Sequence, residues 1–306
     1  MESGIPQGSV LGPILFIIFI NDMPDTVQSH IKIFADDTKI FHAIENMDDI
    51  STVQNDINNL IQWSKKWQLP FNNDKCKVLH FGKKNPRHTY TMGSSELASD
   101  DKEKDVGITF ETTFNFREHI SNMVGKANQR VGLIKRTFSR LNPLSFKLVY
   151  KSLVRPLLEY CSCIWFPIYQ SDINEIEKIQ RRATKLIPTL KNMSYPDRLS
   201  FLGLPTLIYR RKRCDMLQVF RIFHKIDNID FDMFFTRNTN TNRGHQWKLI
   251  KPRADTRTRL NSFSHRVIND WNLLPSNVVE SQTLNSFKGN LEKAWASDPK
   301  KFNPLG

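Results

Sequence analysis

The sequence predicts an α+β fold in which a part with both strands and helices is followed by a longer helical part. Before residue 110, short runs of β-branched and aromatic residues alternate with polar turns and one long amphipathic segment. Beyond residue 111, apolar residues recur at helical spacing with basic residues between them. We therefore expect three parts, at residues 1–110, 111–235 and 236–306.

The composition is that of a folded chain inside the cell. Of its 306 residues, 39% are hydrophobic and 25% are charged, which suits neither a disordered nor a membrane protein. The longest apolar run, 10–20, is shorter than the roughly 20 residues that a membrane-spanning helix needs, and no Lys or Arg precedes it as in a signal peptide. The four cysteines show no disulfide or zinc-finger pattern. We expect no membrane partner and a place in the nucleus and/or the cytoplasm.

The first elements are a helix and a hairpin. The apolar stretch 13–23 follows a Gly- and Pro-rich turn and predicts a buried helix that begins at Pro13. Residues 31–34 and 38–41 flank Ala-Asp-Asp at 35–37, the pattern of a β-hairpin with two carboxylates at its turn.

Next come a helix and several short strands. Apolar residues at helical spacing predict an amphipathic helix over 48–67 that packs on the sheet. Further strands are expected at 77–81, 88–92 and 105–110.

Helices are expected from residue 116 onwards, over 116–138, 143–160 and 173–187. In the last of these, one face is apolar, whereas the other carries four cations. These cations are Lys178, Arg181, Arg182 and Lys185.

Positive charge is concentrated downstream. Residues 1–110 carry 11 basic and 15 acidic side chains, and residues 111–306 carry 33 and 16. A basic part beside a mildly acidic one suggests a surface for nucleic acid, although ordinary solubilising charge explains the same numbers. Arg210 and Arg211 begin a further basic helix, and Arg253 and Arg257 lie in a polar stretch that we expect to be a loop. For these four residues, phosphate binding and a plain solvated surface both remain open.

Two motifs in order carry a resemblance to a known family. Residues 4–13 read Gly-Ile-Pro-Gln-Gly-Ser-Val-Leu-Gly-Pro, and about two dozen residues later 34–37 read Phe-Ala-Asp-Asp. Together they resemble two consecutive palm motifs of reverse transcriptases from non-LTR (LINE-type) retrotransposons. The likeness continues through residues 71–77, 104–108, 138–165 and 262–271.

The resemblance implies a partial polymerase palm with an antiparallel sheet and packed helices, then a helical thumb and a mostly helical C-terminal segment. It implies that Asp36 and Asp37 bind catalytic Mg²⁺ in a two-metal nucleotidyl transfer and that Lys75 protonates the leaving pyrophosphate. Residues near the nucleotide, template and primer would be Gly4, Pro6, Gln7, Gly8 and Phe34. Without the resemblance, none of these residues needs a function. Asp-Asp is common at turns, Gln7 would be an amide that stabilises a turn, and Lys75 would be a surface lysine.

The family pattern also includes fingers and a first metal-binding Asp upstream of the Pro-Gln-Gly motif, where this sequence has only three residues before Gly4. We therefore expect the chain alone to be inactive as an enzyme, and two functions remain open. The first is a fragment of a reverse transcriptase whose parent copies an RNA template from a DNA primer or target with deoxynucleoside triphosphates. The second is a non-catalytic relic that at most binds RNA or DNA through its basic half.

Overall fold

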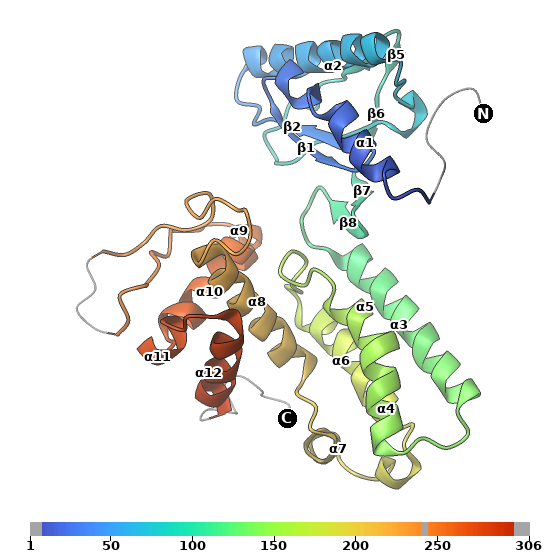
Figure 1. Cartoon of the computed structure of the whole chain (residues 1–306), viewed down its shortest axis with the longest axis vertical. Coiled ribbons are helices and arrows are strands. Elements are labelled where there is room, and N and C mark those ends of the chain that lie inside the picture. The colour runs from blue at the N-terminus through green and yellow to red at the C-terminus, as the bar shows by residue number, and fades with distance from the viewer. Residues whose placement is uncertain (1–7, 240–243, 297–306) are drawn as a thin grey trace. The chain divides into compact units, whose positions relative to one another are not determined.

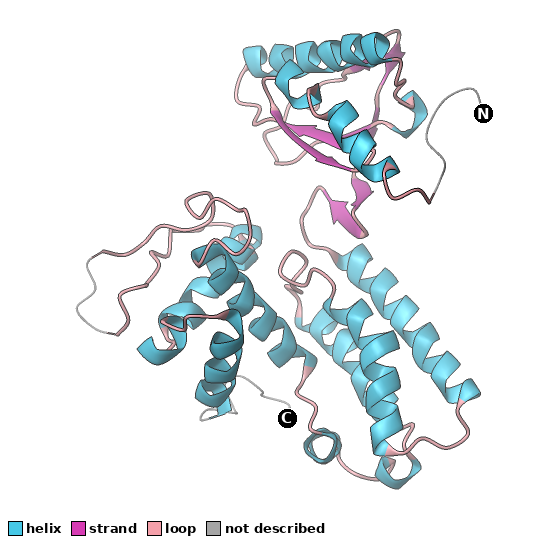
Figure 2. Cartoon of the chain, in the orientation of Figure 1, coloured by secondary structure: helices cyan, strands magenta, loops and turns pink. Residues whose placement is uncertain are grey.

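The computed structural model describes residues 8–239 and 244–296. The chain divides into two compact units, Met1–Glu103 and Lys104–Gly306 (Figure 1). Helices and small two-stranded sheets are mixed in the first unit, whereas the second is mainly helical, with a long loop segment between α8 and α9 (Figure 2). The predicted α+β class is confirmed, and the predicted three-part division stays a prediction.

The described part of the first unit, from residue 8 onwards, contains two helices, two 3-10 turns and six strands. They are α1 (Gly12–Ile20), η1 (Met23–Thr26), β1 (His30–Phe34), β2 (Asp37–Phe41), α2 (Met47–Trp67), η2 (Asn73–Lys75), β3 (Lys77–Leu79), β4 (Thr91–Met92), β5 (Ser95–Glu96) and β6 (Ala98–Asp100). The pairs β1–β2 and β4–β5 are antiparallel, but β3 and β6 are parallel. Within the described residues of this unit, the expected antiparallel pairing is therefore present only as hairpins. The strands predicted at 77–81 and 88–92 are shorter than expected.

Helix α2 is the main support of this unit. It begins with a capping box in which the Asn46 side chain accepts from the Asp49 amide, and the Asp49 carboxylate accepts from the Asn46 amide. Its buried face includes Leu60 and Trp63, which pack with the inward residues of the β1–β2 hairpin. The predicted amphipathic helix is thus confirmed, because its apolar stripe has a sheet to cover.

Helix α1 differs from the prediction of a buried helix. Of its nine residues, only Ile20 is buried, and Ile17 and Ile18 are 60% and 66% exposed. Because the helix is apolar on all sides, its sequence does not specify which side faces a core. Within the described residues of this unit, most of that apolar surface is left uncovered.

The second unit contains the remaining elements. They are β7 (Lys102–Asp105, which begins just before the unit boundary), β8 (Ile108–Glu111), α3 (Arg117–Thr137), α4 (Pro143–Val149), the π-turn η3 (Tyr150–Val154), α5 (Arg155–Glu159), α6 (Gln170–Thr184), η4 (Pro188–Leu190), α7 (Tyr195–Leu202), α8 (Leu207–Phe223), α9 (Arg257–Asn261), α10 (Phe263–Asn272), α11 (Ser276–Val279) and α12 (Leu284–Ala296).

Two predicted elements of this unit are interrupted. The strand expected at 105–110 is broken by a hairpin turn, because Val106 and Gly107 both have positive φ, 44° and 83°, as a type I′ turn requires. The helix expected at 143–160 contains a π-turn ahead of Pro156, which lacks the amide hydrogen that a continuous helix would use.

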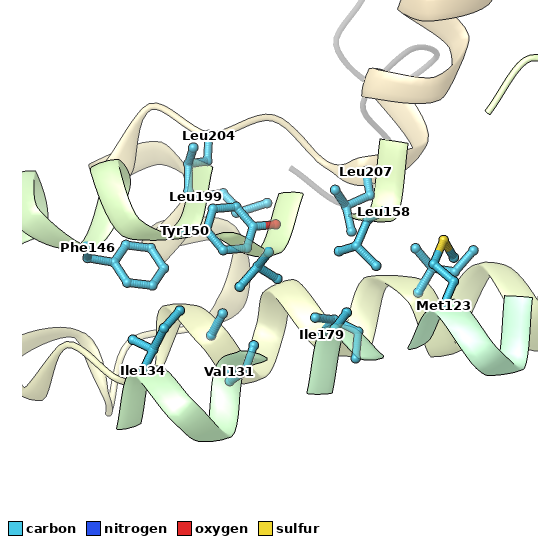
Figure 3. Close-up of a cluster of buried hydrophobic side chains, with 14 of the residues drawn as sticks. Met123, Val131, Ile134, Phe146, Tyr150, Leu158, Ile179, Leu199, Leu204 and Leu207 are labelled. Atoms are coloured by element: carbon cyan, nitrogen blue, oxygen red, sulfur yellow. The ribbon is translucent and has the colours of Figure 1, made fainter. Parts of the chain in front are cut away.

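Two hydrophobic cores hold the second unit together. In the first, Met123, Val131 and Ile134 on α3 pack with Ile179 on α6 and with residues of α4, η3 and α5 (Figure 3). In the second, rings from α8, α10 and α12 stack: Phe220 and Phe287 have centroids 4.3 Å apart. No helix in the described part of the chain is both long and apolar enough to cross a membrane.

Candidate metal-binding turn and nucleic-acid surface

The β1–β2 hairpin places two carboxylates at its tip. Its register pairs Phe34 with Asp37, so that Ala35 and Asp36 form the two-residue turn. Ala35 has φ of 52°, a left-handed conformation that is uncommon for a residue with a side chain. Such backbone strain is concentrated at functional turns, where the surrounding structure maintains it.

The hairpin is fixed to α2 by a buried carboxylate. Asp56, only 1% exposed, accepts hydrogen bonds from the amides of Gln28 and Ser29, both at 2.8 Å. These two residues lead directly into β1, so this contact sets the position at which the strand begins. A second carboxylate, Asp22, accepts from the indoles of Trp63 at 2.7 Å and Trp67 at 3.1 Å, and joins the segment after α1 to the same helix.

The two turn carboxylates are open to solvent. Asp36 and Asp37 are both exposed, and Phe34 beside them is 61% exposed. Adjacent carboxylate oxygens with open sides are the donor set that Mg²⁺ uses when substrate phosphates supply further ligands. This donor set fits the metal in part, because no third His, Cys, Asp or Glu joins the pair within the described residues.

Among the other residues predicted for this site, the structure describes Gly8 and Lys75. Gly8 lies in an exposed turn with φ of 85°, a conformation that suits glycine. Lys75 is the last residue of η2 and is exposed. Gly4, Pro6 and Gln7 lie outside the described residues. Their roles at the turn stay predictions.

The basic face predicted on α6 is present as a surface depression of about 440 Å³. Its four cations are all exposed, and Asn128 of α3 and Glu175 line it with them. The cations are Lys178, Arg181, Arg182 and Lys185. The opposite face of the helix is buried in the first core through Ile176, Ile179 and Ala183, as predicted.

Neighbouring side chains orient part of this basic face. The Arg182 guanidinium donates to the amide oxygen of Asn128 at 3.0 Å, and Arg181 lies 4.8 Å from the ring centre of Tyr195. Sequence reasoning missed Asn128, because a single amide on a polar helix face gives no signal until the neighbouring helix is known.

Two interpretations were open for Arg211, a solvated surface residue or a phosphate ligand, and both require an exposed side chain, which the structure contradicts. Its side chain is 1% exposed, and its guanidinium has no hydrogen-bond partner among the residues that the structure describes. Burial lowers the Arg211 pKa to about 10, although Glu177 and Asp215 oppose this shift. Arg210, by contrast, forms an ion pair: its guanidinium donates to both oxygens of Glu159, at 2.8 and 2.7 Å. These hydrogen bonds raise the pKa of Arg210. Basic residues in a row gave no indication of these acidic partners.

The two basic residues predicted further along the chain remain at the surface. The Arg253 side chain is 91% exposed and forms an ion pair with Asp255, two residues away. Arg257, at the start of α9, lies 4.5 Å from the ring centre of Tyr169, and Arg117 of α3 lies 5.2 Å from the same ring. The structure therefore places Arg257 beside a second cation that the sequence did not indicate.

Known proteins resemble this chain in the segment that holds the hairpin. Residues 1–120 match the family described as reverse transcriptase (RNA-dependent DNA polymerase). Residues 1–120 are therefore similar to part of a reverse transcriptase domain. That segment includes the exposed Asp36–Asp37 turn and the helix that supports it.

Curated relatives extend the likeness beyond the reverse transcriptase segment. The RNA-directed DNA polymerase from mobile element jockey of Drosophila melanogaster is 26% identical over 200 residues, which cover 61% of this chain and 22% of that protein. The jockey polymerase of Drosophila funebris is 27% identical over 203 residues, with the same coverage of both chains. The probable RNA-directed DNA polymerase from transposon BS of Drosophila melanogaster is 26% identical over 209 residues, again with the same coverage.

The chain is thus similar to the reverse transcriptases of non-LTR retrotransposons, as its motifs predicted. It spans about a fifth of the length of these curated relatives. No solved structure gives a significant match.

Proposed function

We propose that this chain supplies a metal-binding palm turn and a nucleic-acid-binding helical body for RNA-templated DNA synthesis by a retrotransposon reverse transcriptase. The observation that carries the proposal is the exposed carboxylate pair at a strained two-residue turn, inside the segment that matches the family. In this proposal the first unit is part of the palm, and the helices from α3 onwards serve as the thumb and C-terminal segment.

The residues of the turn have distinct tasks in this proposal. Asp36 and Asp37 hold Mg²⁺, and the exposed ring of Phe34 borders the primer end. When bound, the metal supplies charge neutralisation for the triphosphate as pyrophosphate is expelled. Asp56 keeps the hairpin in place through the two amides ahead of β1, so that the turn does not need to be ordered by the substrate. Lys75 is the proposed proton donor to the leaving group.

The basic depression on α6 is proposed to contact the phosphate backbone of the RNA template and DNA primer. Four exposed cations face one acidic side chain there, and long cationic side chains in such a row bind phosphates without reading the base sequence. Arg253 and Arg257 are proposed as further phosphate contacts on the same unit.

A second candidate function is nucleic-acid binding without synthesis. It is favoured by the absence of a third metal-ligating side chain beside the pair among the described residues. In that case the cations of α6 would act alone, and the turn would hold a metal weakly at most.

Two assays on the full chain separate these functions. The first measures the affinity for a labelled 20-nucleotide RNA at several salt concentrations. We expect Arg182→Glu to weaken binding and to lower the salt slope by about 0.7 for each phosphate that the protein no longer neutralises. The matched control is Lys65→Glu, a charge reversal on an exposed lysine of α2. Equal affinity for both variants and the wild type would exclude the α6 surface.

The second assay measures primer extension on a poly(rA) template with Mg²⁺. Extension that disappears in Asp36→Asn supports the polymerase function. Because the chain alone is expected not to extend the primer, RNA binding without extension is decided by divalent-ion binding at the turn: ion binding that is lost in Asp36→Asn supports the polymerase function, and no ion binding there supports the second function. A chain that neither binds RNA nor extends the primer contradicts both.

A further inference from the structure

A cleft between α5, α8 and α12 is a second concave site in the helical unit, separate from the depression on α6. Its volume is about 480 Å³, within the roughly 300–1,000 Å³ of small-ligand pockets. Four cations converge on it from two segments distant in sequence: Lys151 and Arg155 come from η3 and α5, and Arg210 and Arg213 come from α8.

The two arginines of α8 are held in place by carboxylates. Arg210 donates to both oxygens of Glu159, and Arg213 donates to Glu292 of α12 at 3.0 and 2.7 Å. A guanidinium has five donors, so each arginine keeps donors that these pairs do not use. The ion pairs thus fix the arginines in position before any ligand arrives, which reduces the entropy cost of binding.

The remaining two cations are less constrained. The Arg155 guanidinium lies 3.6 Å from Glu159, a longer contact than that of Arg210. Lys151 is exposed, and no ion pair is found for it within the described part of the chain. With Glu159 and Glu292 counted against the four cations, the cleft keeps a formal charge of about two positive units.

The walls of the cleft also differ from those of the α6 depression. Leu204, Pro205 and the half-buried Tyr209 line it together with the cations. Low-polarity walls strengthen the attraction between a cation and an anion, because they exclude water from part of the site. A compact anion with about two negative charges suits this combination of size, shape and charge.

We propose that the cleft between α5, α8 and α12 binds a phosphate group. Planar guanidinium groups that are already oriented match phosphate oxygens by paired hydrogen bonds. The phosphate can belong to a nucleic-acid strand, a source that rests on the proposed function, or to free pyrophosphate, which does not. The chemistry at the cleft is the same for both sources.

The experiment uses the full chain with two variants, Lys151→Glu and Arg213→Gln. Both residues lie outside the α6 depression, and unfolding curves show whether either variant alters the fold. The probes are a labelled 20-nucleotide single-stranded RNA, followed by anisotropy over a salt series, and inorganic pyrophosphate, followed by calorimetry. Lys65→Glu serves as the charge-matched control, and Arg182→Glu reports on α6.

If a strand supplies the phosphate, Lys151→Glu reduces the salt slope for RNA by about 0.7 for each phosphate left without its cation, and Arg213→Gln lowers the affinity. If free pyrophosphate is the source, the wild type binds it and neither variant does. Wild-type behaviour of both folded variants toward both probes would overturn the proposal, as would a wild type that binds neither probe. Weaker binding in Arg182→Glu but not in the cleft variants leaves the α6 function standing and rejects the cleft.

Discussion

Replacement of Asp56 by Ala tests the support of the metal-binding turn. Asp56 is almost fully buried and accepts from the amides of Gln28 and Ser29, which lead into β1. A hydrogen bond to a charged group contributes about 1.5–3 kcal/mol, and an amide left buried without a partner costs a similar amount. The substitution also removes the free-energy cost of burying a carboxylate, which offsets part of this loss. We therefore expect the hairpin to be destabilised by about 3 kcal/mol.

Amide hydrogen exchange of residues 28–41 measures this loss directly. Because about 1.4 kcal/mol corresponds to a factor of ten, exchange through hairpin opening should become roughly a hundredfold faster. Asp56→Asn retains one acceptor oxygen and should show about half of the loss in kcal/mol. Asp101→Ala, which removes a surface ion pair to Arg87 at 3.6 Å, should leave exchange unchanged. Exchange in Asp56→Ala within threefold of the wild type would refute the claim that this carboxylate fixes the hairpin.

Two further predictions concern the buried charges of the second unit. Arg211→Met should leave the free energy of unfolding in urea unchanged or raise it, since it removes a buried guanidinium that has no hydrogen-bond partner among the described residues. A decrease of about 3–5 kcal/mol would contradict this and would show that Glu177 and Asp215 depend on this charge. Burial raises the pKa of Asp215 to about 6. Asp270 adds to this increase, whereas Arg266 and Arg211 oppose it. The folded state therefore binds this proton more tightly than the unfolded state, so stability should fall as pH rises from about 4 to about 6. Between pH 4 and pH 6, the free energy of unfolding of the wild type should fall relative to that of Asp215→Asn. Parallel curves of unfolding free energy against pH would contradict the raised pKa of Asp215.

The sequence predicted best those helices that pack against the protein core on one face and meet solvent on the other. The stripe over 48–67 became α2 (Met47–Trp67), and the face with Ile176, Ile179 and Ala183 became the buried side of α6. In both helices, the polar residues indicate which face is exposed, so the apolar face is the one that must be buried. The hairpin was equally clear, because its two strands and its polar turn are adjacent in sequence.

The predictions that failed concern residues whose burial or hydrogen bonding is set by partners distant in sequence. Helix α1 is apolar all round, so its own residues cannot tell a core helix from an exposed one. Arg210 and Arg211 looked alike in sequence, but Glu159 holds one and the core encloses the other. The row of cations on α6 was predictable as a face, whereas the hydrogen bond to Asn128 required the packing of α3 on α6.

Binding of a paramagnetic divalent ion at the hairpin tip tests the central claim most directly. Mn²⁺, which accepts the same oxygen ligands as Mg²⁺, would be added to the ¹⁵N-labelled chain while amide signals are followed. We expect the signals of residues 35–38 to broaden first, and Asp36→Asn combined with Asp37→Asn to abolish this effect, while Asp74→Asn, an exposed carboxylate of η2, leaves it intact. Broadening that begins elsewhere, or that persists in the double variant, would contradict a metal site at this turn.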